Sequence, residues 1–85
     1  MSKLKPSLLV KVISPFETLY KGPAFSVSAV DDYGSFDILP GHENFMALLR
    51  NGSVRVQLPE GEKSIGIHHG IIHVTDDFVE VFADV

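Results

Sequence analysis

Apolar and polar residues alternate along much of this chain with a period of two, which is typical of β-strands that bury one face. The clearest alternations are Phe25–Ala29, Phe36–Ile38 and Val54–Leu58, where serine, aspartate, arginine or glutamine separates the apolar positions. Leu8–Ile13 is almost continuously apolar, and this predicts a strand that is buried on both faces. The hydrophobic pattern therefore favours β-structure from the first strand onward.

Turn-forming residues separate the remaining apolar segments. Thr18–Lys21 is expected to form a short strand that ends at Gly22-Pro23, because proline cannot donate to a strand ladder. Phe45–Leu49 has partly helical spacing, but its brevity and the following Asn51-Gly52 favour a strand that enters a hairpin. Further apolar segments follow at Ile65–Ile67, Ile71–Val74 and Phe78–Ala83.

Turn signals every eight to twelve residues, without an amphipathic helix of useful length, predict an all-β fold. We expect a flattened sandwich or barrel of about eight to ten short, mostly antiparallel strands. The 85 residues suffice for one domain, 1–85, in which residues 1–7 form a flexible lead. The expected core residues are Val10, Val12, Phe25, Val27, Phe36, Ile38, Val54, Val56, Ile65, Ile67, Val79 and Val81.

The charges are unevenly distributed. Up to Val30 four lysines face one glutamate, whereas from Asp31 onward ten acidic residues face three basic ones, and the net charge is −4. No basic stripe with interleaved aromatic residues is present, which argues against nucleic-acid binding. No apolar run approaches the roughly 20 residues that span a bilayer. The absence of cysteine excludes disulfides and thiolate metal sites.

Four histidines provide the first candidate chemistry: His42, His68, His69 and His73. On one continuous strand, His69 and His73 would share a face and His68 would point away, although Gly70 could bend that strand. Two imidazoles with Asp76 or Asp77 could bind a metal ion, but their spacing matches no zinc pattern. Exposed or hydrogen-bonded strand histidines are the more common case.

The serine, acid and histidine of a catalytic trio also occur together, as Ser35, Asp37 and His42. Ser35 lacks the strand–turn–helix context of a nucleophile elbow, and His42 lies beyond a turn. The pairs Asp31-Asp32 and Asp76-Asp77 could be carboxylate pairs or calcium ligands, but neighbouring acids at turn tips are more often turn formers. These motifs do not indicate an enzyme.

The stretch Gly34–His42 (GSFDILPGH) ends in a Pro-Gly corner followed at once by histidine. It resembles the signature of the amino-terminal domain of the F-type ATP synthase epsilon subunit, called delta in mitochondria. The resemblance extends in order from about Leu8 to Val85. Other matching segments are Val12–Pro15, Leu19–Gly22, Gly52–Val56, Gly70–Val74 and Val79–Asp84. The family usually continues into two antiparallel helices, and this sequence stops before them.

The resemblance implies a non-catalytic β-sandwich in the rotor's central stalk, without a cofactor or a metal. In the family this domain holds the foot of the gamma subunit and rests on the polar loops of the membrane c-ring. The complex couples ATP synthesis to proton or sodium transport. The implied location is the cytoplasmic face of the bacterial inner membrane, as a peripheral part of the complex. Carried over by motif, the gamma-facing residues are Ser14, His42, Phe45 and Met46, and the c-ring contacts are Asp32, Tyr33, Gly34 and Ser35.

The sequence departs from the family pattern at several positions. Ser35 stands where the family often has an acid, Asp37 replaces a usual glycine, and His68-His69 replaces serine and glycine. Glu43-Asn44 replaces small residues and a proline. Two alternatives therefore stay open beside the rotor subunit: a stand-alone β-sandwich interaction module, and a small cupin-like metal protein that uses the histidines.

Overall fold

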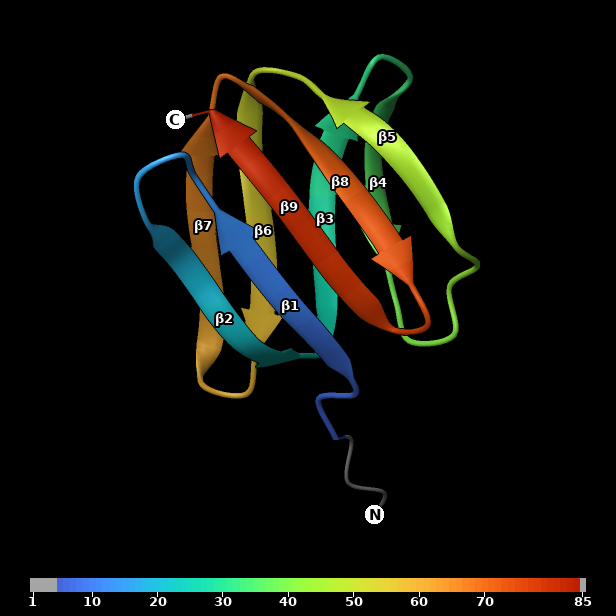
Figure 1. Cartoon of the computed structure of the whole chain (residues 1–85). Helices are drawn as coiled ribbons and strands as arrows, with labels where there is room; N and C mark the ends of the chain where they lie inside the picture. Colours follow the sequence, from blue (N-terminus) through green and yellow to red (C-terminus); the bar gives the residue numbers. More distant parts are fainter. Residues whose placement is uncertain (1–4, 85) are drawn as a thin grey trace.

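The computed structural model describes residues 5–84, and this part of the chain forms nine strands (Figure 1). The strands are β1 (Leu8–Ile13), β2 (Thr18–Ala24), β3 (Ser26–Asp31), β4 (Gly34–Ile38), β5 (Phe45–Leu49), β6 (Gly52–Leu58), β7 (Gly61–Ile67), β8 (His69–Thr75) and β9 (Phe78–Asp84). Residues 1–4 of the expected flexible lead lie outside the described residues, and Lys5, Pro6 and Ser7 precede β1 without forming a strand.

Two sheets stack face to face (Figure 1). One has five strands in the order β2-β1-β9-β8-β5, and the other has four in the order β4-β3-β6-β7. Neighbouring strands pair antiparallel, except that β1 and β9 run parallel. The predicted all-β sandwich is confirmed. Within the described residues no helix has the length and apolar character needed to cross a bilayer.

The inward faces of the two sheets form one apolar core, which drives folding because its side chains leave water. Nine of the expected core residues are buried: Val10, Val12, Val27, Ile38, Val54, Val56, Ile67, Val79 and Val81. Phe36 and Ile65 are half-buried and pack against this core. Seven further buried residues were not predicted: Leu8, Ala24, Ala29, Leu49, Ile72, Val74 and Ala83.

The prediction for Phe25 is wrong, both as a strand residue and as a core residue. Phe25 lies at a bend between β2 and β3, where its N–H donates to the Gln57 carbonyl at 2.8 Å. The bend breaks the alternation, so that Ala24, which ends β2, takes the buried position.

The first two strands also differ from their predictions. β1 buries only one face, because Leu9 is 50% exposed while Leu8, Val10 and Val12 are buried. β2 continues through Gly22 and Pro23 instead of ending there. Proline is tolerated at this position because β2 is an edge strand.

Phe45–Leu49 is a strand, as predicted, but the hairpin at Asn51-Gly52 is wrong. β5 pairs with β8 in the five-stranded sheet, whereas β6 pairs with β3 and β7 in the other. Asn51-Gly52 therefore connects the two sheets. The link is anchored where the Arg50 N–H donates to the Val30 carbonyl of β3 at 2.9 Å.

Candidate functional site

The outer face of the five-stranded sheet carries a row of apolar side chains. Register aligns Ile13 of β1 with Phe82 of β9, Phe82 with Ile71 of β8, and Ile71 with Leu48 of β5. Residues that are directly opposite in neighbouring strands point to the same face, so these four side chains stand side by side. Leu48, Ile71 and Phe82 are exposed in the described structure. We call these four residues the apolar row.

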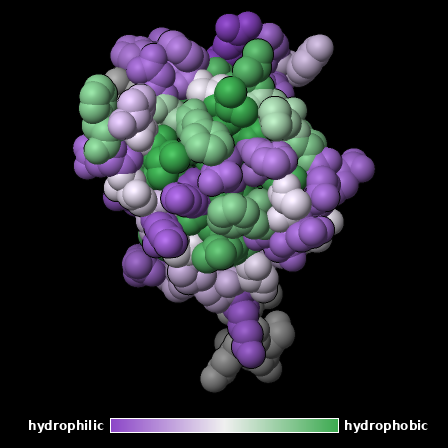
Figure 2. Space-filling model, in the orientation of Figure 1, coloured by the Kyte–Doolittle hydropathy of each residue, from purple (hydrophilic) through white to green (hydrophobic). Residues whose placement is uncertain are grey.

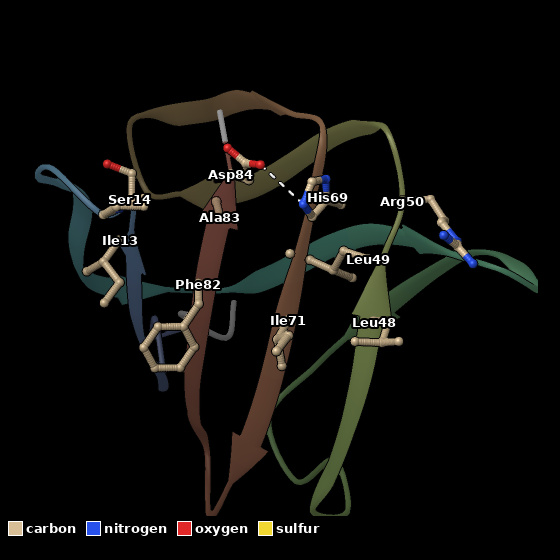
Figure 3. Close-up of a pocket in the computed structure, with 12 residues that line it drawn as sticks. Ile13, Ser14, Leu48, Leu49, Arg50, His69, Ile71, Phe82, Ala83 and Asp84 are labelled. Carbon is tan, nitrogen blue, oxygen red and sulfur yellow. Dashed lines mark ion pairs between the residues drawn. The ribbon is translucent and has the colours of Figure 1, made fainter.

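A hollow of about 550 Å³ lies over this row, toward the end of the sheet where β1 and β9 finish (Figure 3). Its floor includes Ala83 and Leu49 together with the apolar row. Its polar rim includes Ser14, His69 and Asp84. His69 Nε2 lies 3.1 Å from Asp84 Oδ2, within ion-pair distance. An apolar floor with a polar rim is the composition of a protein-contact surface.

A polar band lies beside the apolar row. Register aligns Lys11, Glu80 and His73 across β1, β9 and β8, and on β5 the aligned residue is the apolar Met46. In Figure 2, which views this face, hydrophilic atoms separate hydrophobic atoms above and below them. A partner on this face would therefore meet an apolar strip bounded by charged and polar groups.

The outer face of the four-stranded sheet is different in character. Its aligned outward positions include Ser26 opposite Gln57, and Ser28 opposite Arg55. Ser28 Oγ donates to Asp37 Oδ1 at 2.6 Å. A small polar hollow of about 140 Å³ lies here. Of the two sheet faces, the five-stranded one is the better contact surface because it exposes the larger apolar side chains.

The Pro40-Gly41 corner is held by hydrogen bonds to the β8–β9 turn. Gly41 has φ of 83°, a value that favours glycine, and its N–H donates to Asp77 Oδ1 at 2.7 Å. Asn44 Oδ1 accepts from the Asp76 N–H at 2.9 Å. The position of His42 is therefore fixed by contacts with a distant turn. The corner is a rigid element beside β5.

An aromatic cluster follows this corner. The His42 and Phe45 rings lie 5.0 Å apart, and Phe45 meets Phe36 edge-on at 5.7 Å between centroids. Phe45 is half-buried and packs against the core, whereas Met46, the next residue, is 63% exposed on the outer face. Alternation along β5 explains this difference.

The residues expected to face gamma fall into two groups. Ser14 lines the hollow, and Met46 lies on the same outer face, one outward position before Leu48. His42 and Phe45 lie at the corner where β5 begins. The Ser14 hydroxyl accepts from the Phe16 and Glu17 N–H groups at 3.2 Å each, which shapes the β1–β2 turn.

The four expected c-ring residues are consecutive: Asp32 and Tyr33 form the turn between β3 and β4, and Gly34 and Ser35 begin β4. Tyr33 is 98% exposed at its tip, and its N–H donates to Asp31 Oδ1 at 2.7 Å. Asp32 accepts a two-point hydrogen bond from the Arg50 guanidinium, whose Nη2 lies 2.9 Å from Oδ2. This hydrogen bond lowers the pKa of the Asp32 carboxyl below its usual range. Asp32 thus has a partner within the chain, while Tyr33 is open to solvent.

The candidate metal and catalytic groups are not brought together. His69 and His73 share the outer face of β8, as predicted; Gly70 does not break the strand, and His68 lies in the bend before it. Within residues 5–84 no three histidine, aspartate or glutamate side chains gather closely enough to hold a metal ion. Asp37 Oδ1 accepts a hydrogen bond from Ser28 Oγ, and His42 Nδ1 lies 2.7 Å from the Glu43 carbonyl oxygen. Neither contact links them to Ser35.

Sequence reasoning missed the apolar row and Arg50. One signal was present in the sequence. In β8 and β9 apolar residues occupy consecutive positions, Ile71 beside Ile72 and Val81 beside Phe82, so both faces of each strand carry apolar side chains. In a two-layer sandwich only one of these faces can be covered by the other sheet. The second apolar face is therefore left to solvent or to a partner.

Comparison with known proteins decides the family. Residues 7–85 match the model of the family described as ATP synthase, Delta/Epsilon chain, beta-sandwich domain. The chain belongs to the ATP synthase delta/epsilon β-sandwich family. The resemblance predicted from Gly34–His42 is confirmed. Members of this family among curated proteins also match the chain at moderate identity.

The curated relatives are bacterial ATP synthase epsilon chains. The chain is 40% identical over 75 residues to that of Ruthia magnifica, covering 88% of this chain and 54% of the relative. It is 38% identical over 77 residues to that of Leptospira borgpetersenii, covering 91% and 61%. The chain thus spans little more than half the length of the relatives it matches.

Solved structures support the family fold. A chain in the mitochondrial ATP synthase of Euglena gracilis superimposes with a TM-score of 0.84 at 20% identity, covering 96% of this chain and 53% of that one. A chain in the central stalk and c-ring structure of the Tetrahymena thermophila enzyme gives 0.80 at 14% identity, covering 98% and 67%. At these identities the comparison concerns the fold alone.

Proposed function

We propose that this chain is a non-catalytic rotor domain of an F-type ATP synthase, linking the gamma subunit to the membrane c-ring. Family membership supports this role, and so do the relatives, which are ATP synthase epsilon chains. The role is mechanical: the domain binds two partners and transmits rotation between them. As part of that complex it lies at the cytoplasmic face of a bacterial inner membrane.

The apolar row with its hollow is the observation that carries this proposal. Exposed contiguous apolar surface is costly for a free domain and is typical of protein interfaces. We assign the gamma subunit to this outer face, with Ser14 at the hollow's rim and Met46 beside the row. His42 and Phe45 form the end of the interface at the rigid corner.

The c-ring is assigned to the β3–β4 turn, Asp32 and Tyr33, together with Gly34 and Ser35 at the start of β4. The turn lies at one end of the sandwich, away from the broad outer face (Figure 1). A domain that presents one partner surface on a sheet and another on an end turn is suited to connect two rotor parts. The sandwich between them is rigid because its core is closely packed.

Co-purification with the two partners tests the proposed function. The chain is expressed with the gamma subunit of the same organism, and the complex is then mixed with detergent-solubilised c-ring. We expect a one-to-one complex with gamma that also retains the c-ring on size exclusion. A chain that binds neither partner would instead support the stand-alone interaction module.

A further inference from the structure

Arg50 connects the two proposed docking surfaces. It follows β5 directly and lines the hollow over the apolar row. Its guanidinium points away from the other lining residues, as Figure 3 shows. The group it reaches is Asp32, in the turn assigned to the c-ring. One residue therefore contributes to the rim of one surface and to the geometry of the other.

The connection has two points of attachment. The Arg50 main-chain N–H donates to the Val30 carbonyl at 2.9 Å, and Val30 belongs to β3. The side chain forms a fork with both oxygens of Asp32, just beyond the same strand. Two parallel hydrogen bonds fix orientation as well as distance, because the guanidinium and carboxylate planes must match.

The turn itself presents a single large group to solvent. The Asp31 carboxylate accepts a hydrogen bond from the Tyr33 N–H. Gly34 adopts a φ of 119°, a value that residues with a side chain rarely adopt. With the Asp31 and Asp32 carboxylates both engaged, Tyr33 is the exposed contact group at the tip. A preorganised tyrosine loses little conformational freedom on binding, which makes it an effective anchor.

We propose that Arg50 is a positioning residue that couples gamma docking at the hollow to the presentation of Tyr33 to the c-ring. This inference rests on the proposed function. In the free domain the fork between Arg50 and Asp32 is exposed, so it opens and re-forms in solution. Gamma docked over the hollow restrains the Arg50 main chain and favours the closed fork. The closed fork holds Tyr33 in its binding position.

Binding linkage makes this testable, because coupling between two sites must be reciprocal. The affinity of detergent-solubilised c-ring is measured for the free domain and for its complex with gamma. We expect gamma to raise the affinity of the native domain for the c-ring by roughly three- to fivefold, the scale of one exposed ion pair. Arg50→Met is expected to lose this enhancement.

Matched variants separate the fork from general effects. Arg55→Met removes an exposed arginine from the opposite sheet face and should leave the enhancement intact. The double variant Asp32→Arg with Arg50→Asp exchanges the two charges, so it re-forms an ion pair between the same two positions and should restore part of the enhancement. Thermal melts of all variants confirm that each one is folded. NMR relaxation of the Tyr33 backbone amide should report faster motion in Arg50→Met than in the native domain.

The outcomes distinguish this inference from the proposed function. If Arg50→Met binds both partners with native affinity, native enhancement and native Tyr33 motion, the coupling role is wrong and the rotor function stands. If the native domain binds gamma and the c-ring independently, the coupling is likewise wrong. If it binds neither, the rotor function fails and the coupling role fails with it.

Discussion

The main-chain N–H of Gly41 donates a hydrogen bond to Asp77 Oδ1 at 2.7 Å, across 36 residues of sequence. Asp76 and Asp77 form the tight β8–β9 turn, with φ of 50° and 65°. Both values belong to the left-handed region, and two such residues in succession are typical of a type I′ hairpin. Asp77 therefore serves two purposes: it accommodates the turn and it holds the corner that precedes β5.

Substitutions at Asp77 can separate these purposes. Asp77→Gly keeps the turn conformation but removes the acceptor, and we expect a loss of about 1 kcal/mol in the free energy of unfolding. Asp77→Asn keeps both an acceptor oxygen and tolerance of the left-handed region, so it should stay within about 0.5 kcal/mol of the native chain. Urea denaturation measures both. Equal stability of the two variants would mean that the Gly41 bond contributes nothing.

Gly70 lies where β8 passes close to β9. A Cβ added at this position would stand 2.5 Å from the Phe82 carbonyl oxygen, a main-chain atom that cannot rotate away. We expect Gly70→Ala to cost about 2–3 kcal/mol through overpacking. Gly66 of β7 is the matched control, because an added Cβ there meets nothing within 4 Å. Gly66→Ala should be neutral or slightly stabilising in the same denaturation experiment.

Core substitutions should follow burial rather than residue size. Ile38 is fully buried, so Ile38→Ala should cost about 2–5 kcal/mol and Ile38→Val about 0.5–1.5 kcal/mol. Phe36 is only half-buried, so its truncation to alanine should fall below the roughly 3–5 kcal/mol expected of a fully buried phenylalanine. A larger loss at Phe36 than at Ile38 would contradict this ranking.

The sequence predicted local burial better than it predicted pairing. Alternation in Val54–Leu58 identified which side chains face inward, because neighbouring residues of a strand must point to opposite faces. The same alternation cannot say which strand lies alongside. Asn51-Gly52 had the composition of a hairpin turn but joins two sheets, since β5 pairs with β8 and β6 pairs with β3 and β7. Strand pairing depends on contacts that are distant in sequence.

The candidate site, too, could be predicted only where its residues are close in sequence. The corner Pro40-Gly41-His42 could be found in the sequence because its residues are consecutive. Ile13 and Phe82 could not be connected, since they become neighbours only through the parallel register of β1 and β9. Asp32 and Arg50 are likewise 18 residues apart and meet only where the two sheets approach. Both contacts depend on how distant segments of the chain pack together, which local sequence patterns do not reveal.

Acid should open the fork between Asp32 and Arg50. The hydrogen bond from Arg50 lowers the pKa of Asp32 in the folded state, so the contact stabilises the fold above the ordinary carboxyl range and is lost as pH falls through the lowered value. The affected window therefore lies below about pH 4. Carboxyl chemical shifts of Asp32 should titrate lower in the native chain than in Arg50→Met. Identical titration curves would show that the fork does not persist in solution.

Met46 offers the sharpest test of the gamma-facing surface. It is 63% exposed beside the apolar row, and its register partner on β8 is His73, so a new carboxylate would not bury an unpaired charge. We expect Met46→Glu to fold normally yet to weaken gamma binding by about 2 kcal/mol, or roughly thirtyfold, because a charge would be forced into an apolar contact. Ser64→Glu adds the same charge to the exposed outer face of the other sheet, opposite Arg55, and should not change the affinity. Titration against gamma, with thermal melts of both variants, gives the comparison. Equal affinities for the two folded variants would move the gamma surface away from β5.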